Sequence, residues 1–318
     1  MSTEDRGTQD CRDGTLADGQ TVRGLHAIPS VQVQCGTDVP NGPEERGAGR
    51  PSRPPRGFRS YASFVYEYMK ANLAMQMEYR ATFIGRVFGM MLNDAMWLSF
   101  WLLYFARFPV VRGWERADVI TLWAICALGF GLCFSLFGNI SRLASIVVRG
   151  ELDFYLTYPR HVLLHVATSR MDPTALGDVA FGLVVFFVLV KPTVTQALLF
   201  VLSGVLAACI FFGFTVVAHS LAFVLGSSEL LSEQATSMLI HFATYPLGIF
   251  DGPTKVVLFT LIPAGFINSI PVSVVRGFDP VFFAGLAAAA VLLVTASDRI
   301  FKALLRKYES GNLIQVRM

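Results

Sequence analysis

Two polar residues, Asn93 and Asp94, interrupt an apolar run that covers residues 87–105. An ionised carboxylate at the middle of a membrane-spanning helix costs about 2.5 to 3.5 kcal/mol on insertion scales, so we expect Asp94 to face protein or water. Trp97 and Trp101 follow Asn93 in steps of four residues, which places an amide and two aromatic rings on one stripe of a helix. Two interpretations stay open. Either Asp94 fixes the packing of a neighbouring span, or Asn93, Asp94 and Trp97 line a translocation path.

Segment 149–159 mixes charged and apolar residues and lies between two apolar runs. Helical geometry places Leu152, Tyr155 and Leu156 on one face. Gly150 can end a preceding helix, and Pro159 disfavours a helical conformation for the residue before it. We expect a short amphipathic element at the cytoplasmic surface, which either docks a soluble subunit or has no partner. The residues assigned to docking are Arg149, Gly150, Glu151, Leu152, Asp153, Tyr155, Leu156 and Pro159.

The sequence lacks the motifs of the common catalytic sites. It has no Gly-Lys pair and therefore no P-loop for ATP. The His-Glu-x-x-His zinc motif and the Gly-x-Ser-x-Gly nucleophile motif are also missing. His161 and His165 share a helical face, but a metal site would need further ligands, so we interpret them as a solvated loop face. The sequence therefore predicts no catalytic residue, no metal and no cofactor in this chain.

Composition indicates a membrane protein. Hydrophobic residues make up 53% of the 318 residues and charged residues 15%, against about 25% charged in ordinary soluble domains. Residues 193–228 hold no Asp, Glu, Lys or Arg, and a helix needs roughly 20 apolar residues to cross a bilayer. The net charge is only +3 and the basic residues lie between apolar runs, which argues against nucleic-acid binding.

The apolar runs predict an all-α, polytopic membrane protein with six transmembrane helices. The expected spans are residues 87–105, 119–140, 173–190, 194–225, 230–250 and 281–297. Segment 256–275 is also apolar, but Pro263, Asn268 and Pro271 weaken it as a simple span. We expect this segment to be re-entrant, entering the membrane and returning on the outer side.

Basic residues predict the orientation, because cytoplasmic loops of membrane proteins are rich in Lys and Arg. Six spans place the C-terminal basic cluster, the basic loop 141–172 and the N-terminus together on the cytoplasmic side. Seven spans would expose the C-terminal cluster outside. The loop that carries Arg107, Arg112 and Arg116 runs against this rule.

The chain divides into segments of different character. Residues 1–57 are rich in Gly and Pro and lack apolar periodicity, which predicts a disordered tail. Residues 61–80 have apolar residues at three- and four-residue spacing, which predicts an amphipathic helix lying on the membrane surface. Residues 81–303 form the expected transmembrane domain with the coupling loop 141–172, and residues 304–318 form a cytoplasmic tail.

From about residue 61 to residue 312 the chain resembles the permease subunit of ABC-2-type exporters, in the six-span branch of uncharacterised transport systems. The residues that carry the resemblance are Gly150-Glu151-Leu152-Asp153 with Pro159, Gly177-Asp178, Tyr245-Pro246, Leu261-Ile262-Pro263 and Arg306-Lys307-Tyr308-Glu309-Ser310-Gly311-Asn312. The resemblance implies a plasma-membrane protein with an interfacial helix, six spans, a coupling helix after the second span and a re-entrant outer segment. It also implies a separate ABC ATPase that binds ATP and Mg²⁺, and a second permease that forms a homodimer or a heterodimer with this chain.

The leading hypothesis is therefore the membrane subunit of an ATP-driven exporter that moves an unidentified amphiphilic or polymeric substrate. A membrane-embedded enzyme that modifies lipids is the alternative, and its acid and base groups would come from Asp178, Glu229, Glu233 and His241. An ion-coupled carrier is a third hypothesis, which would require internal repeats or several buried charges.

Overall fold

The long apolar runs of the sequence form the long helices of the protein. The computed structural model describes residues 58–158, 161–226 and 228–308. Residues 1–57, Pro159 and the end of the predicted C-terminal tail lie outside the described residues. Apart from one short hairpin, the regular structure of the described residues is helical, which confirms the all-α class.

The helices are α1 (Phe58–Glu78), α2 (Arg80–Arg107), α3 (Arg116–Phe137), α4 (Leu143–Val148), α5 (Leu152–Leu156), α6 (Val162–Thr168), α7 (Ala175–Val185), α8 (Val194–Ser220), α9 (Ala222–Leu225), α10 (Glu229–Ala243), α11 (Pro253–Thr260), α12 (Ser269–Arg276) and α13 (Pro280–Leu305). Short 3₁₀ turns cover Gly138–Arg142, Leu247–Ile249 and Pro263–Phe266, and a π-helical turn covers Phe186–Val190. The hairpin pairs strand β1 (Val110–Val111) with β2 (Trp114–Glu115).

Three helical stretches within the described residues are both long and apolar enough to cross a membrane: Arg116–Val148, Val194–Leu225 and Pro280–Leu305. A bent pair, Pro253–Thr260 with Pro263–Arg276, would make a fourth if it were one broken span. These stretches coincide with three of the six expected spans, so a multi-pass membrane protein is supported. The count of six stays a prediction.

The other three expected spans differ from these in polarity or length. Helix α2 has 28 residues, about 42 Å at 1.5 Å per residue, but it carries the polar pair Asn93 and Asp94. The stretch Ala175–Val190 is apolar but shorter than the usual crossing helix. Helix α10 has 15 residues and ends before Tyr245-Pro246, because proline disfavours helix at the residue that precedes it.

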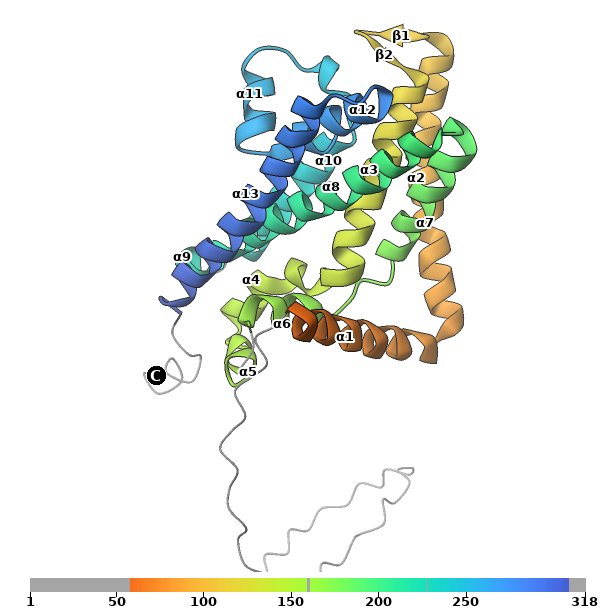
Figure 1. Ribbon diagram of the computed structural model, residues 1–318. Coiled ribbons are helices and arrows are strands. Elements are labelled where there is room, and N and C mark those ends of the chain that lie inside the picture. Colours follow the sequence, from red (N-terminus) through yellow and green to blue (C-terminus); the bar gives the residue numbers. More distant parts are fainter. Residues whose placement is uncertain (1–57, 159–160, 227, 309–318) are drawn as a thin grey trace, which may run out of the picture. The chain divides into compact units, whose positions relative to one another are not determined.

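Helix α3 is the centre of the bundle. It packs against α7 and α8, while α8 also packs against α13, and α2 packs against α7 (Figure 1). Glycines allow some of these backbones to approach closely. A Cβ added at Gly182 on α7 would lie 2.7 Å from the carbonyl oxygen of Ala124 on α3, so this helix pair depends on the missing side chain.

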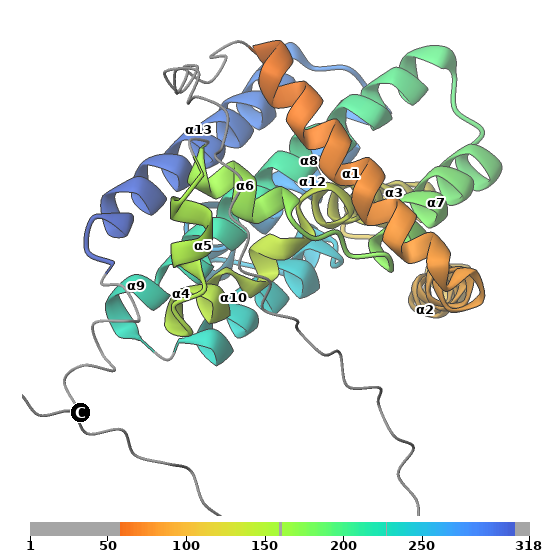
Figure 2. The same ribbon diagram turned by 90° about the horizontal axis from the view of Figure 1, so that it is seen from below.

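Helix α1 lies across one end of the bundle, nearly at right angles to α2 (Figure 1). Figure 2 views this end and shows α1 beside α6. The Asn72 amide donates to the carbonyl oxygen of Thr168 at 3.1 Å, and the Tyr68 hydroxyl lies 2.7 Å from Nε2 of His165. Asn72 is polar and lies between the apolar positions of this helix in the sequence, but its side chain is buried against α6.

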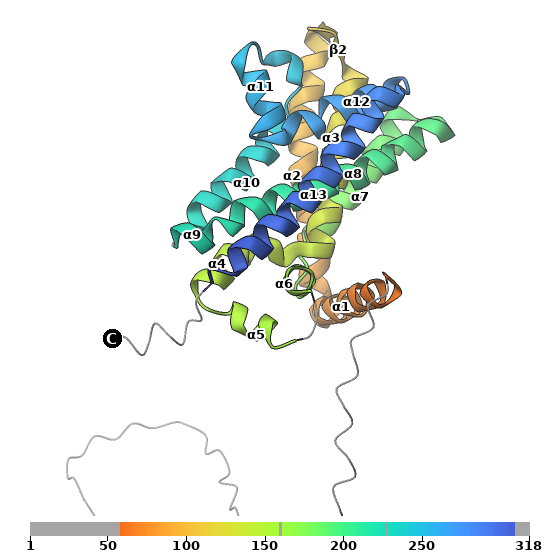
Figure 3. The ribbon, with the colours of Figure 1, turned by 60° about the vertical axis from the view of Figure 1, so that its left-hand side comes forward.

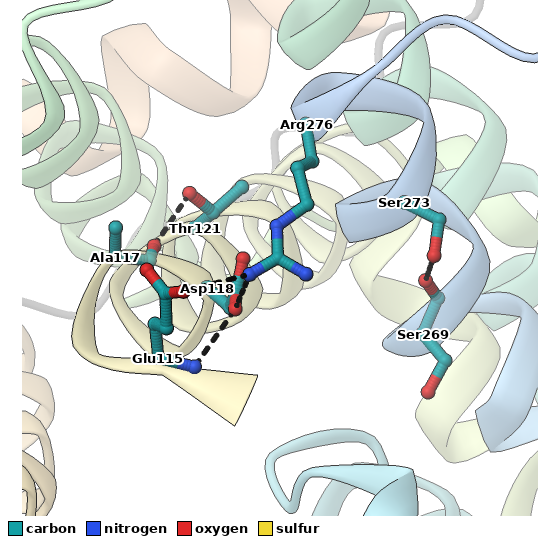
Figure 4. A network of polar contacts seen from close by, with 7 residues as sticks. All are labelled: Glu115, Ala117, Asp118, Thr121, Ser269, Ser273 and Arg276. Atoms are coloured by element: carbon teal, nitrogen blue, oxygen red, sulfur yellow. Dashed lines mark hydrogen bonds and ion pairs between the residues drawn. The ribbon is translucent and has the colours of Figure 1, made fainter. Parts of the chain in front are cut away.

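The opposite end of the bundle carries the hairpin, α11 and α12 (Figure 3). The helical pieces on either side of residues 261–262 meet at a bend of 70°. Arg276 at the end of α12 lies 2.7 Å from the Asp118 carboxylate and 3.7 Å from that of Glu115, at the start of α3 (Figure 4). This ion pair fastens the end of α12, which follows directly on segment 256–275, to the central helix.

A second ion pair joins the hairpin to the same end. Arg112 lies at a turn position with φ of 49°, which is uncommon for a residue other than glycine. Its guanidinium donates to the Asp251 carboxylate at 2.5 Å and to the carbonyl oxygen of Gly248 at 3.0 Å. These bonds hold the turn, and the guanidinium lowers the pKa of Asp251.

Candidate functional site

A cavity of about 210 Å³ lies among helices α2, α3, α7 and α10. Its lining combines polar side chains with six aromatic residues, which are Trp97, Phe100, Trp101, Trp123, Phe130 and Tyr245. Trp97, Phe100 and Tyr245 are also exposed on the outside of the bundle. The cavity therefore has a buried polar end and an aromatic mouth.

Asp94 and Asp178 form the buried polar end. Their side chains are 5% and 3% exposed, and the two carboxyl groups interact directly. The Asn93 amide bonds to the Asp94 carboxyl group. One oxygen of each carboxyl group, Oδ2, is buried without a hydrogen-bond partner among the described residues. Since a carboxylate only accepts hydrogen bonds, a bond between two carboxyl groups requires that one of them carries a proton.

Close packing of α7 on α2 brings these two aspartates together. A Cβ added at Gly177 would lie 2.5 Å from the carbonyl oxygen of Val87 on α2. Only glycine therefore fits at this position without a shift of one helix. Gly177 directly precedes Asp178, so the close approach of the backbones sets the position of the Asp178 carboxyl group against Asp94.

Asn268 fixes the part of the lining that α10 contributes. This fully buried residue donates to the carbonyl oxygens of Phe242 at 3.1 Å and Tyr245 at 3.0 Å. The Tyr245 ring in turn packs edge-on against Trp101, with 5.6 Å between the ring centroids. From the sequence, Asn268 counted only as a residue that weakens a span. Its role in tying segment 256–275 to the cavity needs the three-dimensional contacts.

Asn93, Asp94 and Trp97 all line the cavity. The sequence placed these three residues together, but it did not identify Asp178 as the partner of Asp94. The one sequence signal for that pairing was the Gly177-Asp178 step at the start of an apolar run. Of the four acid and base residues named for a lipid-modifying enzyme, Asp178 and His241 line the cavity, whereas Glu229 and Glu233 do not.

Segment 149–158 forms a turn and the short helix α5. Gly150 has φ of 74° and ends α4 as expected, and the Glu151 amide donates to the carbonyl oxygen of Ile146 at 3.0 Å. This is the hydrogen-bond pattern of a Schellman motif, which satisfies carbonyl groups at a helix end. Arg149 and Glu151 are exposed on either side of the turn.

The apolar residues of α5 divide into an inward and an outward set. Leu152 is fully buried, and the Tyr155 hydroxyl lies 3.1 Å from Oγ of Ser169 and accepts from the Asn139 amide at 3.4 Å. These two side chains therefore anchor the loop and do not face a partner in this conformation, which corrects their expected place on one docking face with Leu156. The exposed apolar side chains are Phe154, Leu156 and Tyr158, which we call the α5 face.

The loop is also joined to the last long helix. The Asp153 carboxylate lies near Tyr308, just beyond α13, and burial together with the Asp153 charge raises the pKa of Tyr308 to about 12. His161 Nε2 lies 2.9 Å from the Asp298 carboxylate, which also accepts from Lys302 at 2.6 Å. Burial and the Lys302 charge lower the pKa of His161.

His161 and His165 do not act together in the structure. His165 is buried among the rings of α1 and α5, including Tyr68 and Tyr155, and its burial lowers its pKa. This corrects the expectation that both histidines belong to a solvated face. Within residues 58–158, 161–226 and 228–308, no three His, Cys, Asp or Glu side chains come together as metal ligands.

Comparison with known families gives one match. The model of a family described as "ABC-2 family transporter protein" matches residues 91–311. The matched range includes every described cavity residue except Met90, together with the α5 face and the bent segment 256–275. No curated protein and no solved structure matches the chain.

Proposed function

The chain belongs to the ABC-2 family of transporter proteins, and from this premise we propose that it is the permease subunit of an ATP-driven exporter in the plasma membrane. Helices long and apolar enough to cross a membrane and the match to a transporter family both support a membrane transport component. ATP and Mg²⁺ would be bound by a separate ABC ATPase. A second permease, identical or related, would complete the transporter in the bilayer, with both termini of this chain on the cytoplasmic side.

The observation that carries the proposal is the α5 face. Phe154, Leu156 and Tyr158 are 58%, 43% and 46% exposed, the first two on the five-residue helix α5 and Tyr158 just after it. Exposed apolar residues beside charged ones mark a protein-binding surface more often than isolated exposed residues do. The buried side of α5 is anchored to neighbouring elements through Leu152 and Tyr155. A force applied to the face would therefore be transmitted to the loop.

Contacts of that loop lead to the rest of the permease. Asp153 reaches the end of α13, His161 reaches Asp298 on α13, and α6 holds α1 through His165 and Thr168. A movement of α5 driven by ATP hydrolysis in the partner would shift the last span and the helix α1 together. We propose that this linkage couples the ATPase to the cavity between α2 and α10, which would be part of the translocation path with Asn93, Asp94 and Trp97.

Replacing Phe154 by Asp tests the docking step. The tagged permease is co-expressed with a candidate ABC ATPase from the same genome, and the amount of ATPase that co-purifies is measured. We expect Phe154→Asp to reduce co-purification at least tenfold, because a central aromatic anchor contributes about 2 kcal/mol or more to an interface.

Thr157→Asp on the same loop is the matched control, since it adds the same charge outside the α5 face. Leu152→Ala is a second control: it should lower thermal stability, because Leu152 is a core residue. Retention of the ATPase by Phe154→Asp, with the permease correctly inserted, would place the docking surface elsewhere.

A further inference from the structure

We propose that the cavity among α2, α3, α7 and α10 is a binding site for an organic ammonium ion that carries an apolar or aromatic body. The inference rests on the proposed function and names the substrate class of that transporter. It is carried by the buried carboxyl pair of Asp94 and Asp178 and by the aromatic wall that separates the pair from the mouth of the cavity.

The polar end of the cavity lacks a counter-charge from the protein. No Lys or Arg is among the described lining residues, and His241 is the one basic side chain there. Buried polar atoms nearly always have hydrogen-bond partners. The unpartnered Oδ2 atoms of Asp94 and Asp178 are therefore positions that a ligand with positively charged N–H donors would satisfy.

The wall of the cavity fits the remainder of such a ligand. Trp97, Trp101, Trp123 and Tyr245 present aromatic rings to the space beside the carboxyl pair. An ammonium group is attracted to the face of an aromatic ring, and the attraction is stronger where water is excluded. The indole nitrogen of Trp123 is buried without a hydrogen-bond partner in the part of the chain that the structure describes, and it offers a donor to an oxygen of the ligand.

Other ligand classes fit this chemistry less well. An anion would be repelled by the carboxyl pair, and a neutral apolar molecule would leave both Oδ2 atoms unsatisfied. A metal ion bound by protein groups would need more ligands than the two carboxyl groups supply. The water molecules bound to such an ion would also make few favourable contacts with the aromatic side chains. An ammonium ion with an apolar body uses the carboxyl groups at the buried end and the rings toward the mouth.

The test uses the full-length permease, purified without its ATPase and placed in lipid nanodiscs. The probe is ethidium, a fixed cation with amino N–H donors and an aromatic body, and its fluorescence reports binding. Two competitors of matched shape, 4-phenylbutylamine and 4-phenylbutan-1-ol, differ in the charged group. We expect the amine to displace ethidium at a concentration about tenfold or more below that of the alcohol.

Substitutions locate the site. Asp94→Asn and Asp178→Asn should each weaken ethidium binding by about tenfold or more, because each replaces a carboxyl oxygen of the pair with an amide NH₂ group, which donates instead of accepting, and keeps the size of the side chain. Glu233→Gln is the control, since it removes an exposed carboxylate of α10 outside the cavity. If either aspartate variant unfolds, the competition experiment on the unaltered protein still decides the question.

Three results would overturn the proposal. The first is that ethidium shows no saturable binding to the unaltered permease. The second is that the alcohol and the amine displace ethidium at the same concentration. The third is that Glu233→Gln lowers the affinity for ethidium as much as the two aspartate variants do. Since the ATPase is absent, failure of the docking hypothesis would leave these measurements unchanged. A permease that binds the ATPase through Phe154 but not ethidium would keep the proposed function and lose only the substrate class.

Discussion

At the scale of single residues, burial decides what each polar side chain does. Asp94, Asp178, Asn72 and Asn268 are all buried within or beside apolar helices, but their surroundings differ. Asn72 and Asn268 donate to backbone carbonyl groups and join elements. The two aspartates keep unpartnered oxygen atoms beside a cavity. Packing therefore explains the asparagines, whereas the aspartates leave hydrogen-bonding capacity for a ligand.

The Tyr68–His165 contact makes the attachment of α1 to α6 sensitive to pH. Burial lowers the pKa of His165 below its usual value near 6.5. Its other ring nitrogen, Nδ1, is buried without a partner, so a second ring proton would be left without an acceptor. The contribution of neutral His165 to the free energy of unfolding is fully present above about pH 6.5. It is lost as the pH falls through the lowered pKa, because His165 takes up a proton at a higher pH in the unfolded chain than in the folded protein.

Thermal unfolding of the purified permease at pH 7.5 and pH 5.5 measures this effect. The unaltered protein should lose more stability on acidification than His165→Gln, whose side chain does not titrate. Tyr68→Phe should lower stability at pH 7.5 by about 1 kcal/mol, the usual net value of one hydrogen bond. Equal acid sensitivity of the unaltered protein and His165→Gln would assign the pH dependence to other groups, such as His161.

At the scale of elements, apolar runs and helix-breaking residues predicted most boundaries. The run at 281–297 became α13, the run at 194–225 became α8 and α9, and Gly150 ended α4. These features are local, because a helix end depends on the few residues around it. The face that α5 turns toward its neighbours depended on Asn139 and Ser169, which lie outside the element. The exposure of Phe154 could therefore not be deduced from helical spacing.

Contacts between distant elements explain the other differences. The pairing of Asp94 with Asp178 requires that α7 approach α2, and this depends on the space at Gly177. A sequence shows the glycine but not the backbone that it meets. The bend in segment 256–275 was expected from its prolines, whereas the Arg276–Asp118 bond that ties the end of α12 to α3 joins residues far apart in sequence.

Gly177→Ala tests whether the close approach of α7 and α2 builds the cavity. The added methyl group would meet the Val87 carbonyl oxygen at 2.5 Å, so we expect a loss of about 1 to 3 kcal/mol in stability from overpacking. Gly89→Ala on α2 is the control, because a Cβ there meets nothing within 4 Å. It should be neutral or stabilising by up to about 1 kcal/mol, since alanine favours helix.

Thermal unfolding of the two glycine variants supplies the measurement. Ethidium binding in the same samples would show whether a shift of α7 also displaces the Asp178 carboxyl group. Equal melting temperatures for Gly177→Ala and Gly89→Ala would mean that the helices adjust without cost, and the positioning role of Gly177 would then be dropped.

At the scale of the whole molecule, charge placement separates the two ends of the bundle. The basic loop with Arg107, Arg112 and Arg116 runs against the positive-inside rule, but the structure supplies acidic partners at that end. Arg112 of this loop pairs with Asp251, and at the same end Arg276 of α12 pairs with Asp118. The positive-inside rule counts basic residues and is not a net-charge rule, so these pairs do not remove the conflict. The outer location of the hairpin stays a prediction from the basic C-terminal cluster, because six spans would return the C-terminus to the cytoplasm.

Cysteine labelling tests that topology in a background in which Cys11, Cys35, Cys126, Cys133 and Cys209 are replaced by Ala. Single cysteines are then placed at Val110 in the hairpin and at Ser310 near the C-terminus, and intact cells receive a membrane-impermeant maleimide. We expect Val110→Cys to react in intact cells and Ser310→Cys to react only after permeabilisation. Val110 was chosen because it is exposed and its replacement leaves the Arg112–Asp251 pair in place. Labelling of Ser310→Cys from outside would require an odd number of crossings and make segment 256–275 a broken span, since the 70° bend allows either path.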